Sequence, residues 1–575
     1  MKQRNLNLIK GVLAEAVKKA GFEMGPDQLH VEKTKEAKFG DFSTNVAMLL
    51  SGKAGRRPLH VADEIAKQID SKLFEKVEVA PPGFINLRLE QKFYTDEAGE
   101  WLDDFDKYLK ESFALPAKKR AVIDYSHPNI AKPMGVHHLL STIIGDSVKK
   151  IYRRYGWEVI SDNFIGDMGT QFGKLMAAIK KWGNMEEIEK DPIPALQKLY
   201  VQFHMEADKD VELDDEGRAE YLKFEQGDKA ARKLWKRIVE WSLLDMQQIY
   251  DRLGVSFDHM NGESFYEDKM QDVLDEGREQ RVIVDGEGDS WIIKPDEPED
   301  VPVLVRKSDG ATLYATRDLA RIKYWEDEWS PDLMLNVVDT AQSFYFNQLF
   351  FAQRKLGLTT ARNVHIAFGR MQFADGSMST RKGNILLLAD LLDEAEKRAL
   401  DLITERGVEL PEEGRRELAR IMGIGSVKYS ILQQARTTNI TFDWNKMLTF
   451  EGNSAPYLMY TVTRANSVMR KAGVTPRDCR KYALQLSLDI EKKLAIQLMM
   501  YPDTVRRAAE EFKPNHMANY LYELAQDFNS FYNGNPILQA ESKDLKESRL
   551  MLTALTIEVM RDGFQLLGLE VPEKM

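Results

Sequence analysis

Three side chains that could donate hydrogen bonds to a triphosphate lie close together in the first third of the chain. Lys132, His137 and His138 follow the short apolar run 121–123, which is typical of a buried parallel strand. Loops at the carboxyl ends of parallel strands are where open α/β sheets bind ligands. A helix that begins there points free N–H groups at phosphate. The segment is therefore a candidate nucleotide-binding turn, but on composition alone plain polar surface is the better interpretation of a histidine pair at a helix start.

The elements that must position this turn follow in order along the chain. The apolar run, a helical pattern from about residue 136 to 152 and a strand-like run at 157–160 have the outline of a strand–helix–strand unit. Strand-like runs return at 334–338 and 364–368, after a charged and mostly helix-like stretch. We therefore predict a Rossmann-like α/β core that is interrupted by an insertion.

The segments on either side of this core have different patterns. The N-terminal segment combines helical periodicity with strand-like runs at 77–79 and 84–89, which are separated by a turn. From about residue 387 onward almost everything is helix-like. The prediction is a multidomain chain: an N-terminal α/β domain at 1–115, the α/β core at 116–386 with its insertion at about 175–302, and a C-terminal all-α bundle at 387–575.

Composition narrows the class of protein. The chain has 575 residues, more than one hydrophobic core normally holds, and 43% of them are hydrophobic. No run approaches the roughly 18 apolar residues of a membrane span, and the amphipathic stretch 6–19 is interpreted as the start of a domain, not as a targeting peptide. Cys479 is the only cysteine. A single thiol suits a reducing compartment and cannot build a thiolate zinc site. We expect a cytoplasmic protein with no membrane partner and no metal site of its own.

Net charge leaves nucleic acid open as a partner. The formal charge of −11 weighs mildly against it, because counterion release from nucleic acid requires cationic surface. A local basic stripe can still bind phosphate on an acidic protein.

The predicted nucleotide-binding turn resembles a known signature. Residues 122–146 read VIDYSHPNIAKPMGVHHLLSTIIGD, which is similar to the nucleotide-binding signature of class I aminoacyl-tRNA synthetases in its arginyl-tRNA synthetase version. That version contains His-x-Gly-His, and here Gly135 stands in place of its first His and His137 in place of its Gly. The resemblance implies that Pro133, Gly135, His137 and His138 contact ATP.

A second class I signature is matched at residues 376–384, GSMSTRKGN. The usual lysine of this signature is Ser377 here. That lysine would stabilise charge developing on the triphosphate. Some arginyl enzymes lack it and use the lysine that corresponds to Lys132. By itself a basic glycine-containing loop is more often a solvated turn. The resemblance implies catalytic roles for Lys132, His138 and Lys382, ATP contacts from Met378, Ser379 and Lys382, and Mg²⁺ to neutralise the phosphates.

Further matches imply a site for arginine, whose planar guanidinium prefers carboxylates placed for bidentate hydrogen bonds. By resemblance, Glu263 and Asp318 would bind the guanidinium and Tyr314 would pack beside it. Asn129 and Gln342 would hold the amino and carboxylate end. Each carboxylate alone is more often surface charge, but their occurrence in order makes coincidence improbable. Such a site should reject lysine by roughly 10⁴ or more, so no editing domain is expected.

Two parts of the chain resemble tRNA-binding domains of the same family. Tyr457, Tyr460 and Arg464 share one helix face, and an aromatic and basic face suits RNA. Core packing with a snorkelling arginine is about as common on spacing alone. The block resembles the start of an anticodon-binding domain. The segment that contains Phe84 and Asn86 resembles part of the family's N-terminal domain, which meets the outer corner of tRNA. The resemblance implies that these two residues contact tRNA, although a turn with a core phenylalanine fits them equally well.

Together these resemblances imply ATP-dependent attachment of L-arginine to tRNA(Arg) through an arginyl-adenylate, by a monomer. Two alternatives stay open. The altered signatures could belong to a catalytically silent relative that still binds tRNA, or the chain could be a class I synthetase for another amino acid. The retained arginine-binding residues argue against a silent relative. The N-terminal domain, together with Glu263, Tyr314 and Asp318, argues against a synthetase for another amino acid.

Overall fold

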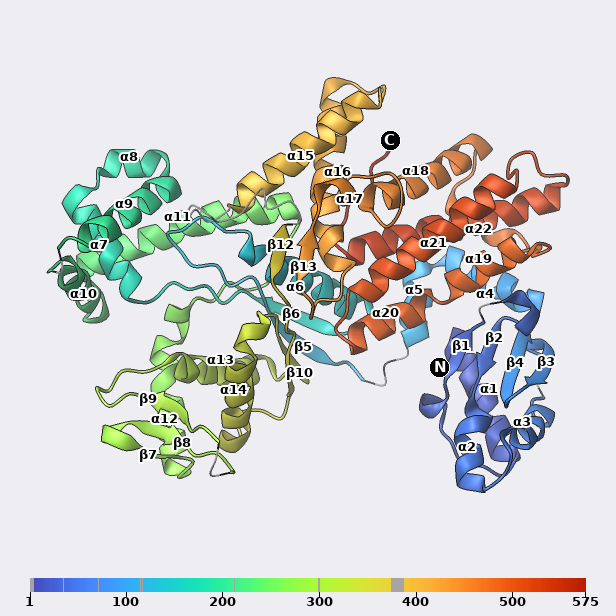
Figure 1. Cartoon of the computed structure of the whole chain (residues 1–575), viewed down its shortest axis with the longest axis horizontal. Coiled ribbons are helices and arrows are strands. Elements are labelled where there is room, and N and C mark those ends of the chain that lie inside the picture. The colour runs from blue at the N-terminus through green and yellow to red at the C-terminus, as the bar shows by residue number, and fades with distance from the viewer. Residues whose placement is uncertain are drawn as a thin grey trace. The chain divides into compact units, whose positions relative to one another are not determined.

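The structure is a computed structural model, and it describes residues 5–34, 36–70, 72–113, 115, 117–210, 212–297, 300–373 and 387–575. The chain divides into two compact units, which are described separately below (Figure 1). One unit comprises Met1–Ala117, Arg154–Gly156 and Leu448–Met575, and the other comprises Lys118–Arg153 and Trp157–Met447.

The second unit is built on a four-stranded parallel sheet. Its strands are β5 (Arg120–Asp124), β6 (Glu158–Asp162), β10 (Leu333–Asn336) and β11 (Arg362–His365), in the order β11-β10-β5-β6. Helix α6 (His137–Arg154) connects β5 to β6. Most of β5 and all of β10 are buried on both faces, as expected of parallel strands covered by helices. The predicted α/β core is confirmed.

A long insertion separates β6 from β10. Its first part is helical: α7 (Thr170–Trp182), α8 (Met185–Lys190), α9 (Pro192–Ala207), α10 (Glu212–Glu225) and α11 (Lys229–Leu253). Figure 1 shows α7 to α10 gathered at one end of the long α11. The Asp228 side chain accepts hydrogen bonds from Ala230 and Ala231 at the start of α11, and Gly254 ends it in a left-handed conformation.

The second part of the insertion contains a small sheet that the sequence did not predict. It comprises η3 (Glu263–Lys269), α12 (Met270–Glu279), β7 (Ile283–Asp285), η4 (Glu287–Asp289), β8 (Trp291–Ile293) and β9 (Val303–Arg306), followed by α13 (Tyr314–Trp329). The three strands pair antiparallel in sequence order. Strands of three or four residues are too short to establish an alternating pattern.

The unit ends with elements on both sides of the segment that is not described. They are η5 (Thr340–Gln342), α14 (Ser343–Leu356), β12 (Met371–Phe373), α15 (Leu388–Glu405), α16 (Glu412–Leu432), β13 (Ile440–Phe442) and α17 (Trp444–Met447). Residues 387–447 thus group with the parallel sheet, whereas the sequence placed them in the C-terminal domain. Helical periodicity shows which face of a helix is buried, but not which core covers that face.

The N-terminal part of the first unit is an α/β domain. Its antiparallel sheet has the strand order β1-β2-β4-β3 and lies beside helices α1, α2 and α3 (Figure 1). The elements are α1 (Asn5–Lys19), η1 (Pro26–Gln28), β1 (Val31–Lys33), η2 (Ala37–Phe39), β2 (Phe42–Thr44), α2 (Val46–Ala54), α3 (Pro58–Lys67), β3 (Phe74–Ala80), β4 (Phe84–Leu89), α4 (Gln91–Asp103) and α5 (Phe105–Phe113). The predicted N-terminal α/β domain is confirmed.

The C-terminal part of this unit is helical, as predicted. It comprises α18 (Ala455–Ala472), η6 (Pro476–Lys481), α19 (Asp489–Met499), α20 (Tyr501–Glu510), α21 (Asn515–Gly534) and α22 (Lys543–Leu566). Ser454 caps α18 by accepting a hydrogen bond from the Tyr457 amide, and Cys479 of η6 is fully buried. None of the helices in the described ranges is long and apolar enough to cross a membrane.

Candidate active site

Three adjacent parallel strands end in buried polar residues. Asp124 ends β5, Asp162 ends β6 and Asn336 ends β10, and the three residues are in register across the sheet. Each is at most 2% exposed. The carboxyl edge of the sheet therefore carries two carboxylates and an amide that need partners.

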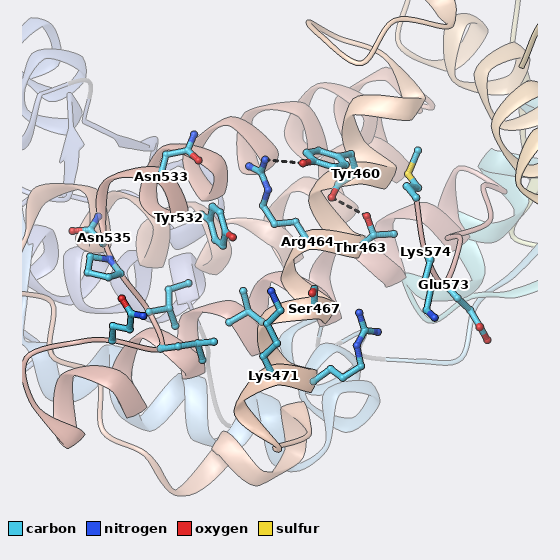
Figure 2. Close-up of a pocket in the computed structure, with 17 residues that line it drawn as sticks. Tyr460, Thr463, Arg464, Ser467, Lys471, Tyr532, Asn533, Asn535, Glu573 and Lys574 are labelled. Atoms are coloured by element: carbon cyan, nitrogen blue, oxygen red, sulfur yellow. Dashed lines mark hydrogen bonds between the residues drawn. The ribbon is translucent and has the colours of Figure 1, made fainter. Parts of the chain in front are cut away.

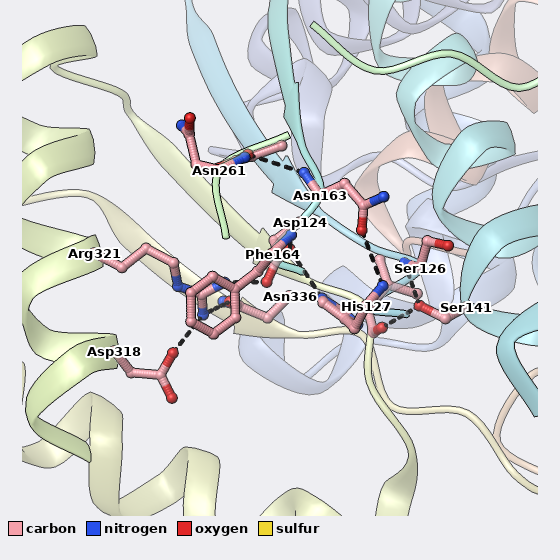
Figure 3. A network of polar contacts seen from close by, with 12 residues as sticks. Asp124, Ser126, His127, Ser141, Asn163, Phe164, Asn261, Asp318, Arg321 and Asn336 are labelled. Carbon is pink, nitrogen blue, oxygen red and sulfur yellow. Dashed lines mark hydrogen bonds and ion pairs between the residues drawn. The ribbon is translucent and has the colours of Figure 1, made fainter. Parts of the chain in front are cut away.

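Arg321 of α13 supplies the main counter-charge (Figure 3). Its guanidinium forms a buried ion pair with Asp124 and donates to Asn336 Oδ1 at 3.2 Å. It also lies 3.0 Å from Asp318. Burial opposes ionisation of Asp124, but Arg321 and His127 outweigh it and lower the pKa of Asp124 to about 2. This arginine ties the insertion helix to two strands of the sheet.

Side chains hold the loop after β5 in an unusual conformation. Ser126, His127 and Ala131 have positive φ angles of 86°, 54° and 61°, which are uncommon for residues other than glycine. His127 Nε2 lies 2.9 Å from Asp124, and the His127 amide donates to Asn163 Oδ1 at 3.1 Å. These contacts over-determine the loop, as is common where a backbone is shaped for a ligand.

The predicted nucleotide-binding turn leads directly into α6. The Gly135 amide donates to His138 Nδ1 at 3.1 Å, and the His137 and His138 ring centroids are 3.9 Å apart. His137 is exposed and His138 is partly buried. Burial and the neighbouring His137 lower the pKa of His138 to about 3, so this ring is neutral at pH 7 and can donate through Nε2.

Lys132 leaves the same turn in the direction of the insertion. Its ammonium donates to Gln171 Oε1 of α7 at 2.9 Å and lies 4.5 Å from the centre of the Tyr200 ring of α9. Pro133 is half-buried beside it. The other predicted ATP contacts, Met378, Ser379 and Lys382, lie outside the described residues.

The two predicted guanidinium-binding carboxylates are close enough to influence each other. Glu263 begins η3 and lies 3.3 Å from Arg317 of α13. Asp318 accepts a hydrogen bond from the Tyr345 hydroxyl in addition to its contact with Arg321. Burial raises the pKa of Glu263 to about 6; Arg317 acts against that shift, whereas Asp167 and Asp318 add to it. Burial is thus the main reason for the raised pKa of Glu263, and the two neighbouring carboxylates add to it.

The other predicted arginine-binding residues are on the surface of this unit. Tyr314, the first residue of α13, is 71% exposed, and Asn129 and Gln342 are also exposed. Asn129 forms a β-bridge with Gly166, where a β-carbon would overlap the Asn129 side-chain oxygen. A larger residue at position 166 would displace the Asn129 side chain from this position. Of the five residues, Glu263 and Asp318 are the ones that interact.

Sequence reasoning did not name several residues of this site, among them Arg317, Arg321, Asp124 and Tyr345. A local signal existed for one of them: Asp318 and Arg321 have the i, i+3 spacing of a helical ion pair. The pairing of Arg321 with Asp124 joins segments far apart in sequence, and periodicity carries no signal for such a contact.

A second candidate site lies in the helical part of the other unit (Figure 2). A cavity of about 770 Å³ is lined by Tyr460, Arg464, Lys471, Tyr532 and the C-terminal Lys574, among others. The Arg464 guanidinium lies 4.6 Å and 4.8 Å from the centres of the Tyr460 and Tyr532 rings. It donates to Asn529 Oδ1 at 2.7 Å. Aromatic faces and cations thus meet in one hollow.

The remaining predicted tRNA contacts differ in exposure. Tyr457 does not line the cavity; its hydroxyl accepts a hydrogen bond from Asn529 at 3.1 Å. In the N-terminal sheet Phe84 is 37% exposed, whereas Asn86 is 8% exposed and accepts a hydrogen bond from the Ser43 hydroxyl. Phe84 and Tyr460 are therefore the more accessible aromatic candidates.

Family models cover most of the chain. Residues 105–444 match the catalytic domain of class I tRNA synthetases (R), residues 458–575 match the DALR anticodon binding domain, and residues 7–89 match the arginyl tRNA synthetase N terminal domain. The parallel sheet and its predicted nucleotide-binding turn lie within the first of these matches. The fold and the match define a class I aminoacyl-tRNA synthetase.

Curated relatives and solved structures narrow this class. The chain is 40% identical over 555 residues to the arginine--tRNA ligase of Fusobacterium nucleatum, and this match covers 96% of each chain. It is 38% identical over 570 residues to the arginine--tRNA ligase of Clostridium perfringens, and this match covers 98% of this chain and 100% of the relative. Its fold is similar to the arginyl-tRNA synthetases of Plasmodium falciparum (TM-score 0.83, 23% identity, 100% of both chains) and Thermus thermophilus (TM-score 0.81, 22% identity, 99% of both chains). The chain belongs to the arginyl-tRNA synthetase family.

Proposed function

We propose that this enzyme attaches L-arginine to tRNA(Arg) in two steps, of which only the first consumes ATP. In the first, an arginine carboxylate oxygen attacks the α-phosphorus of ATP, the bond to the β-phosphate oxygen breaks, and pyrophosphate leaves. In the second, a 3′-terminal hydroxyl of the tRNA attacks the arginyl carbonyl and AMP leaves. Arginine--tRNA ligase relatives that align over nearly the whole chain support this reaction.

The observation that supports arginine as the amino acid is the electrostatic environment of Glu263. Its carboxylate is 14% exposed, and its pKa is raised to about 6 although Arg317 lies 3.3 Å away. A second guanidinium would relieve the remaining repulsion from Asp167 and Asp318. Because a guanidinium can bind two carboxylates in fixed geometry, the pair Glu263 and Asp318 favours arginine over lysine.

The remaining contacts with the amino acid are proposed from the family motifs. Asn129 and Gln342 would hold its amino and carboxylate groups, and the exposed Tyr314 would close over the side chain. An exposed ring at the first residue of a helix can move without disturbing the helix, which suits a group that covers a ligand.

For ATP, we propose contacts from both signatures. Pro133, Gly135, His137 and neutral His138 would line the base and phosphates, and Lys132 would stabilise the charge that develops on the triphosphate. Met378, Ser379 and Lys382 would approach from the second signature. Mg²⁺ would accompany the nucleotide and be held mainly by its phosphates, as is usual for this ion.

For tRNA, we propose that the cavity beside α18 receives unstacked bases. Tyr460 and Tyr532 offer ring faces, and Arg464 and Lys471 offer cations, the combination that binds single-stranded RNA. The cavity lies within the match to an anticodon-binding domain. Tyr457 would support Tyr460 and Arg464 through Asn529. Phe84, with Asn86 shaping its strand, would contact the outer corner of the tRNA.

Two further properties are proposed. The single thiol suits the reducing cytoplasm, and we expect a monomer, which light scattering at micromolar concentration would test.

The decisive experiment compares three proteins in arginine-dependent ATP–pyrophosphate exchange with tRNA present, followed by charging with labelled arginine. The proteins are the parent, Lys132→Ala, and the double variant Gly135→His with His137→Gly. We expect activity in the parent, a loss of 10²-fold or more in Lys132→Ala, roughly the effect of losing one preorganised donor, and preserved or higher activity in the double variant. Exchange in the double variant but none in the parent would instead indicate a catalytically silent relative.

A further inference from the structure

The ammonium of Lys132 is held by two neutral groups from two helices of the insertion. Gln171 of α7 accepts one of its hydrogen bonds, at 2.9 Å, and the Tyr200 ring of α9 lies 4.5 Å from it. All three side chains line one small cavity together with Asn129 and Gly166. The insertion therefore reaches the nucleotide-binding turn through two specific side-chain contacts.

Other lysines of this region have a different kind of partner. Lys174, Lys180 and Lys181 of α7 are ion-paired with Asp214, Glu220 and Glu216, at distances up to 3.1 Å. Across the described ranges, no ion pair joins Lys132 to a carboxylate. An amide oxygen and a ring face orient an ammonium without neutralising it, and they leave two of its three N–H groups for a ligand.

The next turn of α9 adds no negative charge. His204 packs edge-on against Tyr200, with ring centroids 4.5 Å apart. Burial lowers the pKa of His204; Lys174 and Lys132 lower it further, against Asp214 and Asp208. The side chain that α9 places against Tyr200 is therefore an imidazole and not a carboxylate.

We propose that Tyr200 and Gln171 are positioning residues that present the Lys132 ammonium to the triphosphate of ATP. This inference rests on the proposed function, because Lys132 acts on ATP only if the chain forms an adenylate. It explains how a chain with Ser377 in place of the usual lysine directs one cation to the phosphates: the insertion fixes that cation from outside the two signatures.

We call the contacts of Tyr200 and Gln171 with Lys132 the clamp. Substitutions can test separately whether the clamp orients the ammonium and whether the clamp must be uncharged. Tyr200→Leu removes the ring face, and we expect kcat for pyrophosphate exchange to fall about three- to tenfold, the range for one cation–π contact, with an unchanged KM for arginine. Tyr200→Phe keeps the ring and should restore kcat. Gln171→Glu keeps the shape but adds a charge, so it should hold Lys132 more tightly and still lower kcat. Val201→Ala, a change of a side chain that is 49% exposed on the same helix, is the control.

A second measurement reports on the clamp without using activity. Brief acetylation followed by peptide mass spectrometry gives the relative reactivity of Lys132, with the exposed Lys198 of α9 as the internal reference. We expect Tyr200→Leu to raise Lys132 reactivity relative to Lys198, and Tyr200→Phe and Val201→Ala to leave it unchanged.

The outcomes distinguish the clamp from the proposed function. If the parent shows no arginine-dependent exchange although Lys132 reactivity responds to Tyr200→Leu, the clamp exists but the proposed function and the positioning role both fail. If the parent is active and Tyr200→Leu and Gln171→Glu change neither kcat nor Lys132 reactivity, the positioning role alone is overturned. Equal losses in Tyr200→Leu and Tyr200→Phe would show that the ring face is not the active feature.

Discussion

Glu263 illustrates a conflict between burial and ionisation within one side chain. A carboxylate must be charged to bind a guanidinium tightly, yet burial raises the pKa of Glu263 to about 6, and Asp167 and Asp318 add to that effect. The residue is therefore only partly ionised in mildly acidic solution. Binding of a cation would lower this pKa again.

This conflict predicts a pH dependence of arginine binding. As the pH falls from 7.5 to 5, protonation of Glu263 removes the charge that binds the guanidinium. The Kd for arginine should rise, with a slope that approaches about tenfold per pH unit below pH 6. Isothermal titration calorimetry with arginine alone measures this without the titration of ATP.

A matched variant assigns the effect to Glu263. Glu263→Gln keeps the shape, so we expect weaker binding by about 3 kcal/mol at pH 7.5 and no inflection near pH 6. Asp268→Asn, a change at a nearby side chain that is 81% exposed, should behave like the parent. If the inflection near pH 6 persists in Glu263→Gln, a group other than Glu263 causes it.

At the scale of elements, Arg321 joins α13 to the ends of β5 and β10 through Asp124 and Asn336. The Arg321 and Asp124 side chains are both 2% exposed. A buried charge left without its partner is far more costly than a pair replaced together.

We therefore expect Arg321→Met to lower the free energy of unfolding by about 3–5 kcal/mol. The double variant Asp124→Asn with Arg321→Met should lose less than the single variant. Urea unfolding followed by circular dichroism measures both. A double variant less stable than Arg321→Met would mean that His127 and the Phe164 amide, which also contact Asp124, dominate its environment.

The cavity beside α18 permits a second test at this scale, because its aromatic and cationic side chains should act differently on tRNA. Tyr460→Ala should weaken binding by about 1–3 kcal/mol and leave the salt dependence unchanged. Arg464→Ala should weaken binding and reduce the slope of log K against log salt by about one. Filter binding at several salt concentrations gives both quantities.

Tyr457→Phe is the control for this cavity, because it removes only the hydroxyl that meets Asn529. It should change tRNA binding much less than Tyr460→Ala does. If all three variants bind tRNA like the parent at every salt concentration, the cavity is not a contact surface for tRNA.

At the scale of the whole molecule, local pattern predicted some elements and not others. The parallel strands β5, β6, β10 and β11 were predictable because a strand-like run overlaps each of them and helical or loop segments lie between these runs. The strands β7, β8 and β9 were not, because they lie in or directly after a charged, mostly helix-like stretch and are too short to stand out from it. The grouping of residues 387–447 with the parallel sheet depends on tertiary packing, which no local period records.

Only some residues of the candidate active site could likewise be predicted from the sequence. Motif resemblance named Glu263 and Asp318, but not the arginines that balance them. Arg317 and Arg321 interact with residues brought together only by the fold. Their effect on the pKa values of the site could not be read from spacing.

The N-terminal domain permits a test that involves tRNA but not the active site. Phe84 is the exposed aromatic side chain at the start of β4. Phe84→Ala should raise the KM for tRNA by about tenfold, the effect of losing roughly one stacking contact. Exchange at saturating tRNA should keep the parent's kcat and KM for arginine. An unchanged KM for tRNA would remove Phe84 from the contact surface.

The burial of the single thiol in η6 has a practical consequence for spectroscopy. Burial raises the pKa of Cys479 to about 12, with Asp478 and Glu547 adding to the shift, and only a thiolate reacts readily with maleimide dyes. The natural cysteine can therefore stay in place while one exposed position in each compact unit is changed to cysteine. A donor and an acceptor fluorophore attached there would report, one molecule at a time, how the distance between the units responds when tRNA binds.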